Sequence, residues 1–185
     1  MLNGTALLHA KYYRMVRTIQ INDFDQDESM TRAKMTSQKP KVLFLSTGNA
    51  TRSLIAEGFL RTLTGDRFEV ASAGVEPSAL NPLASEVMKE AGIDISGQEP
   101  KSVAQSVKER FGYVIAICDT AKERSPIFPF TLHLQHWSVV DPNTAGGLPE
   151  QRAEAFRHVR DEIKDKVGQF IADTAQAKAN ELSIA

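Results

Sequence analysis

The stretch from Lys41 to Gly58 reads KVLFLSTGNATRSLIAEG, and it decides the fold. The run Val42-Leu43-Phe44-Leu45 is continuously apolar, which is typical of a strand that is buried on both faces. A polar loop containing Gly48 follows this run. A helix is then predicted from Arg52 to Thr64, with Gly65 as its C-terminal stop. The apolar face of this helix is made by Leu54, Ile55, Phe59, Leu60 and Leu63.

Strand-like and helix-like segments alternate along the rest of the chain. Asn81 and Pro82 suit the N-cap and first turn of a second helix, which Gly92 ends, and a closing helix starts at about Glu150. Strands that alternate with helices imply parallel βαβ units, so the predicted fold class is α/β. The further strands are predicted at Phe68–Ala71, Tyr113–Cys118 and Thr131–Leu134.

Three parts of the chain differ in composition. Residues 1–39 lack sustained periodicity, and we expect a flexible or poorly ordered extension there. Residues 40–172 carry the alternating pattern and form the predicted domain. Residues 173–185 are polar and rich in alanine, so we expect a C-terminal tail that frays.

The N-terminal extension has two further interpretations. It could be an overlong reading of the gene start, with Met30 or Met35 as the real start. The acidic cluster from Asp23 to Glu28 argues against a transit peptide. The rival interpretation is a short strand or helix that docks on the domain through apolar and aromatic residues, namely Tyr12, Tyr13, Val16 and Ile19.

Composition and charge exclude several classes of protein. The chain has 185 residues, 42% of them hydrophobic and 24% charged, which is an ordinary globular balance. A net charge of −1 argues against nucleic-acid binding, which needs clustered basic residues. No apolar run is long enough to span a bilayer, so we expect no membrane partner and a cytoplasmic location.

The loop from Ser46 to Ser53 has the features of an anion site. A helix N-terminus presents unpaired N–H groups and partial positive charge. Gly48 permits a turn that directs successive N–H groups to one point, and Arg52 can add a bidentate fork. The alternative is an ordinary strand-to-helix turn with a surface arginine. The loop is not GxxxxGK[ST], and no GxGxxG occurs.

These residues resemble a known family. The segment Val42–Gly58 is similar to the signature of low-molecular-weight protein tyrosine phosphatases and of the thioredoxin-coupled arsenate reductases that share their fold. The resemblance implies a four-stranded parallel sheet flanked by helices in three αβα layers. The similarity continues in register to Phe170 through SAGVEP (72–77), NPLASEVMKEAGIDIS (81–96), ICDTAKERSPIFP (117–129), HWSVVDP (136–142) and FRHVRDEI (156–163).

The resemblance favours the reductase branch. The phosphatase branch often follows its catalytic Asp-Pro with aromatic residues, whereas Asn143 and Thr144 follow Asp141-Pro142 here. The family implies that Arg52 and the loop hold the oxyanion, that Asp141 protonates the leaving oxygen, and that Asn49 and Ser53 brace the loop. A loop aspartate that merely starts a turn is the rival interpretation of Asp141. The oxyanion-binding set is Thr47, Gly48, Asn49, Ala50, Thr51, Arg52 and Ser53.

Ser46 departs from the family pattern. Both branches place a nucleophilic cysteine there, and its thiolate attacks phosphorus or arsenic. A serine hydroxyl is far less acidic than a thiol and needs an adjacent general base, which no sequence feature supplies, although His133 or His136 could approach in space. Ser46 fits a laboratory variant, a natural pseudoenzyme or a natural enzyme with slow serine chemistry. The sequence therefore leaves open whether the chain is an enzyme.

The cysteine count limits redox chemistry. Cys118 is the single cysteine of the chain and corresponds to one redox cysteine of the reductase branch. Ser125 stands where the next one is expected, and Thr51 stands where many relatives carry a loop cysteine. One thiol cannot form an intramolecular disulfide, so Cys118 is interpreted as a redox remnant or as a small buried residue.

The resemblance also bears on cofactors and partners. No cofactor is required, but Asn49, Glu57, Ser72 and Asp94 resemble the positions of a potassium site in the reductase branch. Glu57 and Asp94 could equally be solvated carboxylates. The implied partners are phosphate, arsenate or a phosphorylated substrate, together with a thioredoxin-like protein.

These observations predict an oxyanion-handling protein that binds phosphate or arsenate in the loop 46–53, with catalysis impaired by Ser46. The alternative is an inactive module that binds a phosphorylated ligand or protein. Trp137 is expected to serve packing rather than recognition.

Overall fold

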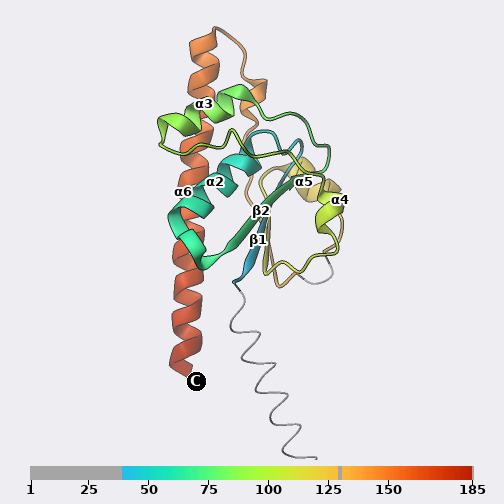
Figure 1. Cartoon of the computed structure of the whole chain (residues 1–185), viewed down its shortest axis with the longest axis vertical. Coiled ribbons are helices and arrows are strands. Elements are labelled where there is room, and N and C mark those ends of the chain that lie inside the picture. The colour runs from blue at the N-terminus through green and yellow to red at the C-terminus, as the bar shows by residue number, and fades with distance from the viewer. Residues whose placement is uncertain (1–38, 129–130, 185) are drawn as a thin grey trace, which may run out of the picture. The chain divides into compact units, whose positions relative to one another are not determined.

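A computed structural model describes residues 39–128 and 131–184 of the chain (Figure 1). The three interpretations of the N-terminal extension concern residues that lie outside this range, apart from Lys39. In the described residues, four parallel strands form one sheet in the order β2-β1-β3-β4. The α/β fold with a four-stranded parallel sheet is therefore confirmed. The strands are β1 (Lys41–Ser46), β2 (Glu69–Gly74), β3 (Tyr113–Ala116) and β4 (His133–His136).

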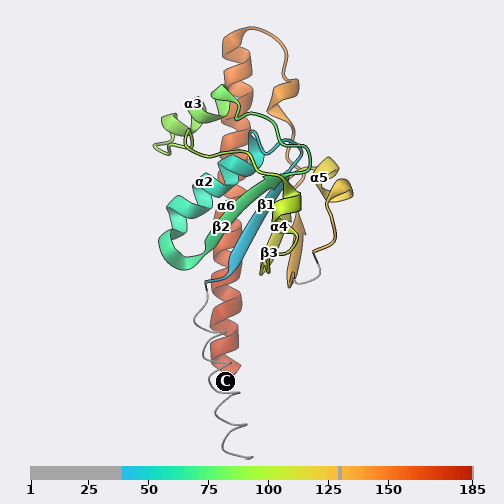
Figure 2. The same ribbon diagram turned by 45° about the vertical axis from the view of Figure 1, so that its right-hand side comes forward.

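Helices connect the strands and cover both faces of the sheet (Figure 2). The crossover between β1 and β2 is α2, whose predicted bounds are confirmed, and Gly65 ends it with a positive φ of 53°. Asn81 caps α3 as expected, because its side chain accepts a hydrogen bond from Leu83 N. The helices are α2 (Arg52–Thr64), α3 (Pro82–Glu90), α4 (Val103–Ser106), α5 (Asp119–Arg124) and α6 (Pro149–Ile184), with short 3-10 turns η1 (Gly65–Arg67) and η2 (Pro142–Thr144).

The apolar run of β1 divides between two hydrophobic cores. Val42 and Phe44 join the core under α2, α3 and α6, whereas Leu43 and Leu45 join the core under α4 and α5. Successive side chains of a strand point to opposite faces, so a strand without alternation must be buried on both sides. The expectation for this strand is confirmed. It fixes the end of β1 deep in the molecule, between β2 and β3.

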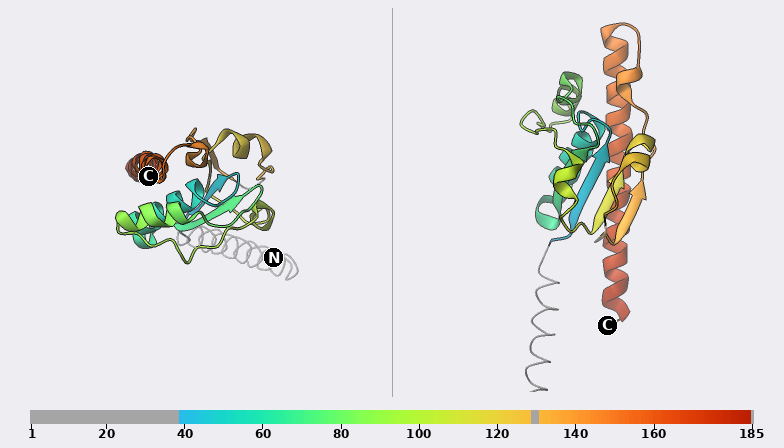
Figure 3. Two further views of the ribbon diagram at one scale, coloured as in Figure 1. Left: turned by 90° about the horizontal axis from the view of Figure 1, so that it is seen from above. Right: turned by 90° about the vertical axis from the view of Figure 1, so that its right-hand side faces the viewer.

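Several predicted boundaries were wrong. The last strand begins at His133 rather than Thr131, and the side chains of Leu132 and Leu134 are exposed although their apolarity suggested burial. Leu63 was expected on the apolar face of α2, but it is 52% exposed. The closing helix does not end near Ala172. It continues to Ile184 and extends past both ends of the strands (Figure 3).

Candidate functional site

The loop from Ser46 to Ser53 joins the carboxyl end of β1 to the first turn of α2. Ligands of open α/β sheets bind at this edge of the sheet. The loop is buried: Ser46, Asn49, Thr51, Arg52 and Ser53 all have at most 7% of their surface exposed. This position is where the sequence predicts an anion site.

The backbone of the loop is oriented by the segment that follows β2. Loop carbonyl groups accept hydrogen bonds from N–H groups of residues 75–81. The pairs are Val75 N to Ser46 O (3.3 Å), Glu76 N to Thr47 O (2.9 Å), Ser78 N to Gly48 O (2.9 Å) and Asn81 N to Ala50 O (2.9 Å).

The N–H groups of the loop therefore point the other way. A trans peptide unit holds its C=O and its N–H on opposite sides, so each carbonyl that faces segment 75–81 turns the next N–H away from it. The N–H of Asn49 shows this direction, since it donates to Ser46 Oγ over 3.1 Å. In the described part of the chain, the N–H groups of Gly48 and Thr51 have no acceptor. The loop thus presents free N–H donors, as an anion cradle requires.

The backbone conformation differs in one detail from the expectation. The left-handed residue is Asn49, with φ of 47°, and not Gly48. A Cβ at Gly48 would lie 2.7 Å from Ser78 Oγ, so the Ser78 side chain would have to move. The constraint on Gly74, at the end of β2, is stricter because the neighbouring atoms belong to the backbone. A Cβ there would lie 2.8 Å from Asn49 N and 2.9 Å from Thr47 O.

Ser46 is held by two hydrogen bonds at the base of the loop. Its Oγ lies 2.7 Å from Ser53 Oγ and accepts the N–H of Asn49. Neither histidine considered as a general base contacts it. The His133 ring stacks on Tyr113, and His136 Nε2 lies 3.0 Å from an Asp119 oxygen. Among the described residues, no side chain that could act as a base contacts the Ser46 hydroxyl.

Arg52 extends from the first turn of α2 toward the loop that follows β4. Its Nη1 donates to Val139 O and its Nη2 donates to Asp141 Oδ2. The donor–acceptor distance is 2.9 Å in each bond. The Arg52 side chain is 8% exposed and that of Asp141 is 35% exposed, so the pair is only partly screened by water. Asp141 also caps η2, since its Oδ1 accepts from Asn143 N over 3.0 Å. The cap matches the interpretation of Asp141 as the start of a turn, and its role as general acid stays a prediction.

These groups surround a cavity of about 230 Å³. In the described part of the chain the lining contains no aromatic side chain. Sequence reasoning missed the roles of Glu76, Ser78 and Asn143 in it. A carboxylate beside an anion site is unfavourable, but Glu76 forms an ion pair with Arg124. The lining residues are Ser46, Thr47, Gly48, Ala50, Thr51, Arg52, Glu76, Ser78, Asp141 and Asn143.

Cys118 lies beside the loop rather than in it. The thiol is buried, lies 3.4 Å from Thr47 Oγ1 and accepts the N–H of Ala121, so it caps α5. Thr51, at the position of the loop cysteine of many relatives, has a buried hydroxyl without a hydrogen-bond partner in the described residues.

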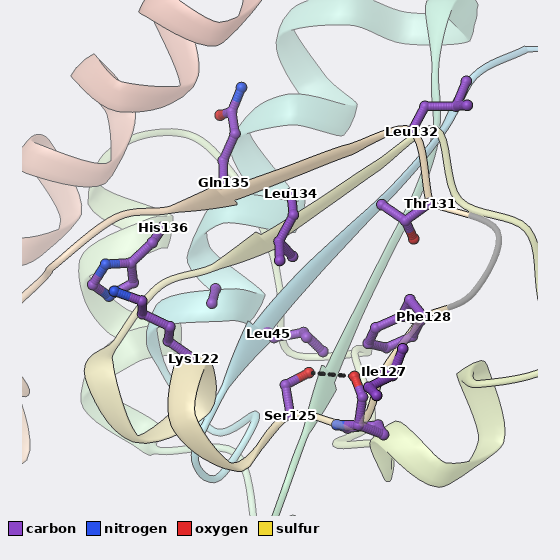
Figure 4. A pocket seen from close by; sticks show the side chains of 12 residues that line it. Leu45, Lys122, Ser125, Ile127, Phe128, Thr131, Leu132, Leu134, Gln135 and His136 are labelled. Atoms are coloured by element: carbon purple, nitrogen blue, oxygen red, sulfur yellow. Dashed lines mark hydrogen bonds between the residues drawn. The ribbon is translucent and has the colours of Figure 1, made fainter.

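Ser125 lines a second cavity of about 490 Å³ (Figure 4). The walls of this cavity are mostly apolar and include Phe128 and Leu134. The Ser125 hydroxyl contacts the Pro126 carbonyl oxygen at a distance of 3.4 Å.

Trp137 packs on Phe44 with ring centroids 5.6 Å apart, in agreement with its expected packing role.

The residues that resemble a potassium site lie partly together. Asn49 Nδ2 donates to Ser72 Oγ over 2.8 Å, and Ser72 Oγ donates to Glu57 Oε2 over 2.6 Å. Asp94 shares a surface pocket with Glu57 but is not hydrogen-bonded to this group. The backbone N–H of Ser96 lowers the pKa of the Asp94 carboxyl below its usual value.

A cation already contacts the buried carboxylate of this set. The guanidinium of Arg61 forms an ion pair with Glu57 Oε1. Among the described residues, no group of three or more histidine, cysteine, aspartate and glutamate side chains could hold a metal ion. The Arg61 guanidinium thus contacts one member of the predicted potassium set, and the potassium site itself stays a prediction.

Comparisons with known proteins agree with this geometry. Residues 41–181 match the family described as low molecular weight phosphotyrosine protein phosphatase. The arsenate reductase of Bacillus licheniformis is 38% identical over 138 residues, which cover 75% of this chain and 99% of the relative. The arsenate reductase of Bacillus subtilis is 38% identical over 129 residues, which cover 70% and 93%.

Solved structures give the same picture. An arsenate reductase in the phosphate binding state is 33% identical, with a TM-score of 0.63, and the match covers 72% of this chain and 98% of that one. A thioredoxin-dependent arsenate reductase of Corynebacterium glutamicum is 27% identical, with a TM-score of 0.62, and the match covers 79% and 67%. No helix in the described part of the chain combines the length and apolarity needed to cross a membrane.

Proposed function

The chain belongs to the low molecular weight phosphotyrosine protein phosphatase family, and on that premise we propose that it binds phosphate or arsenate in the loop 46–53 with impaired catalysis. The observation that supports binding most strongly is the orientation of the loop. Its carbonyl groups are held by residues 75–81, its N–H groups turn the other way, and Arg52 lines the same cavity. Unpaired N–H donors beside a guanidinium suit a tetrahedral oxyanion.

Binding follows from charge and geometry. The N-terminus of α2 contributes partial positive charge, and the buried Arg52 adds a full one. Arg52 keeps further N–H donors beside those that Val139 O and Asp141 accept, because a guanidinium carries five. The relative with phosphate bound supports the same ligand class for this chain.

Catalysis would use Asp141 and the atom at position 46. In this proposal the nucleophile at position 46 attacks in line, Arg52 and the loop N–H groups hold the equatorial oxygens, and Asp141 protonates the leaving oxygen. Ser46 has hydrogen-bonding partners around its Oγ, and among the residues that the structure describes no base contacts it to remove its proton. Donors stabilise an anion once it has formed, but they do not accept a proton, so attack by Ser46 is slow.

Arsenate reduction is limited for a second reason. Reduction of arsenate to arsenite takes two electrons, which two thiols supply when they join in a disulfide. A thioredoxin-like protein would then reopen that disulfide. Cys118 is the one thiol of this chain, so we propose that the intramolecular cycle does not run.

The experiment compares the unmodified chain with Ser46→Cys and Ser46→Ala in an aryl phosphatase assay. We expect phosphate release from Ser46→Cys and none above background from the other two proteins. The double variant Ser46→Cys with Ser125→Cys should in addition consume arsenate when thioredoxin and its reductase are present. Activity of the unmodified chain that Ser46→Ala abolishes would contradict impaired catalysis. Binding of phosphopeptides in preference to inorganic phosphate would favour the phosphoprotein-binding alternative.

A further inference from the structure

A continuous row of hydrogen bonds leads from the protein surface to Ser46. At the outer end Arg61, on the last turn of α2, pairs with Glu57 one turn earlier on the same helix. The Arg61 side chain is 60% exposed, whereas that of Glu57 is 4% exposed. The row then runs from Glu57 through Ser72 on β2 to Asn49, Ser53 and Ser46.

The Glu57 carboxylate fixes the direction of the bonds from Ser72 as far as Ser53. An ionised carboxylate only accepts, so Ser72 must donate its single hydrogen to Glu57. Ser72 Oγ can then only accept, which requires Asn49 to present its NH2 group rather than its carbonyl oxygen. The second hydrogen of that NH2 group goes to Ser53 Oγ over 2.8 Å.

Asn49 transmits this orientation to the loop. Its Oδ1 accepts the N–H of Lys101 over 2.7 Å, and its own N–H donates to Ser46 Oγ. Asn49 is fully buried and has a positive φ, a backbone conformation that costs energy unless the surroundings hold it. The conformation of the loop 46–53 thus depends on the side-chain amide of Asn49. The hydrogen bonds that link Asn49 through Ser72 to Glu57 set the orientation of this amide.

We propose that Arg61 is a positioning residue. Its guanidinium supplies, from within the chain, the positive charge that holds Glu57 and through it the loop. Its Nη2 contacts Glu57 and also donates to Val70 O over 2.8 Å, so the guanidinium is anchored to β2 as well as to α2. It holds the Glu57 side chain in place, and through Ser72 and Asn49 it keeps the loop in its binding conformation. The chain therefore needs no external potassium ion at this site. The effect on anion affinity rests on the proposed function, but the effect on stability does not.

Loss of Arg61 leaves a buried carboxylate without its partner, which is costly. Without Arg61 the Glu57 carboxylate either stays without a counter-charge, which loosens its hold on Ser72 and Asn49, or recruits a cation from solution, which restores part of that hold. The stability of the variant then depends on the cation supplied.

The test measures melting temperature and phosphate affinity in potassium, sodium and choline chloride at equal ionic strength. The proteins are the unmodified chain, Arg61→Gln, Arg61→Lys and Arg67→Gln. Arg67 is a matched control, because it is also an exposed arginine close to the end of α2. Its guanidinium lies over the Phe68 ring and not beside Glu57.

We expect the melting temperature of the unmodified chain to be the same in all three salts. Arg61→Gln should melt about 4–8 °C lower in choline chloride, recover partly in potassium chloride and bind phosphate about tenfold more weakly. Arg61→Lys should retain most of both properties, and Arg67→Gln should resemble the unmodified chain. The proposal is overturned if Arg61→Gln behaves like Arg67→Gln, or if potassium stabilises the unmodified chain over choline. If the unmodified chain binds no phosphate, the proposed function fails, and the melting temperatures still decide the role of Arg61.

Discussion

Arg52 and Asp141, 89 residues apart in the chain, form an ion pair of 2.9 Å at the wall of the candidate oxyanion cavity. The pair places the proposed anion ligand next to the proposed general acid. It also means that a bound anion shares Arg52 with a carboxylate.

Removing the charge of Asp141 should therefore strengthen anion binding. In Asp141→Asn, Arg52 loses a competing carboxylate and the anion loses a repulsive neighbour, so phosphate should bind about three to ten times more tightly. Titration calorimetry measures this change. Asp119→Asn is the control, because Asp119 is exposed and does not line the cavity. Unchanged or weaker binding in Asp141→Asn would argue that the carboxylate does not face the anion.

Gly74 should be as important for the loop as the residues of the loop itself. A Cβ at this position meets backbone atoms of Thr47, Gly48 and Asn49 within 2.9 Å, so Gly74→Ala must displace the loop. We expect a loss of about 1–3 kcal/mol in the free energy of unfolding and a loss of phosphate binding.

The control for that substitution is Gly168→Ala in α6. No atom lies within 4 Å of a Cβ at Gly168. This change should stabilise the chain by about 0.4–1 kcal/mol, because alanine favours the helix. Urea denaturation measures the free energy of unfolding of the two variants. Equal changes in this free energy would contradict the predicted clash between a Cβ at position 74 and the loop backbone.

The elements around the loop were the most predictable part of the fold. Continuous apolarity indicated that β1 is buried on both faces, and the glycine and asparagine signals placed the ends of α2 and the start of α3. The last strand was misplaced because Leu132 and Leu134 are apolar yet exposed. Apolarity indicates burial only on average, and an edge strand can expose such residues.

The site was predictable in its residues but not in its contacts. The loop sequence pointed to Ser46 and Arg52, and the resemblance pointed to Asp141. No local pattern shows that Val139 O holds Arg52 or that Arg61 pairs with a carboxylate two hydrogen bonds away from Asn49. Such contacts arise from tertiary packing. The positive φ of Asn49 was missed because glycine is the usual residue in that conformation. The expected domain boundaries and the roles of the site residues stay predictions.

The core beneath the site should depend strongly on α6. Ile163 is fully buried in the core that α6 shares with α2, so Ile163→Ala should cost about 2–5 kcal/mol in the free energy of unfolding. Asp165→Ala on the exposed side of the same helix should change it by less than about 0.5 kcal/mol. Urea denaturation measures both values. A small effect of Ile163→Ala would mean that α6 is not packed on the sheet as described.

A thiol at position 46 should be unusually acidic. The N–H of Asn49, the Ser53 hydroxyl and the N-terminus of α2 all favour negative charge at this atom. In the variant Ser46→Cys with Cys118→Ser, which leaves one thiol, we expect a thiol pKa below about 7, compared with about 8.5 for a free cysteine. Absorbance at the thiolate band as a function of pH measures it. A value at or above that of free cysteine would show that the donors do not converge on position 46.

The most direct test of the central claim is a calorimetric titration of the unmodified chain with inorganic phosphate and with arsenate, beside Arg52→Ala. The N–H groups of the loop and the Arg52 guanidinium predict saturable binding of both anions at one site. They also predict at least a tenfold loss of affinity in Arg52→Ala, with the circular dichroism spectrum of the fold retained. Absence of saturable binding at millimolar anion, or equal binding by Arg52→Ala, would contradict the assignment of an oxyanion site to this loop.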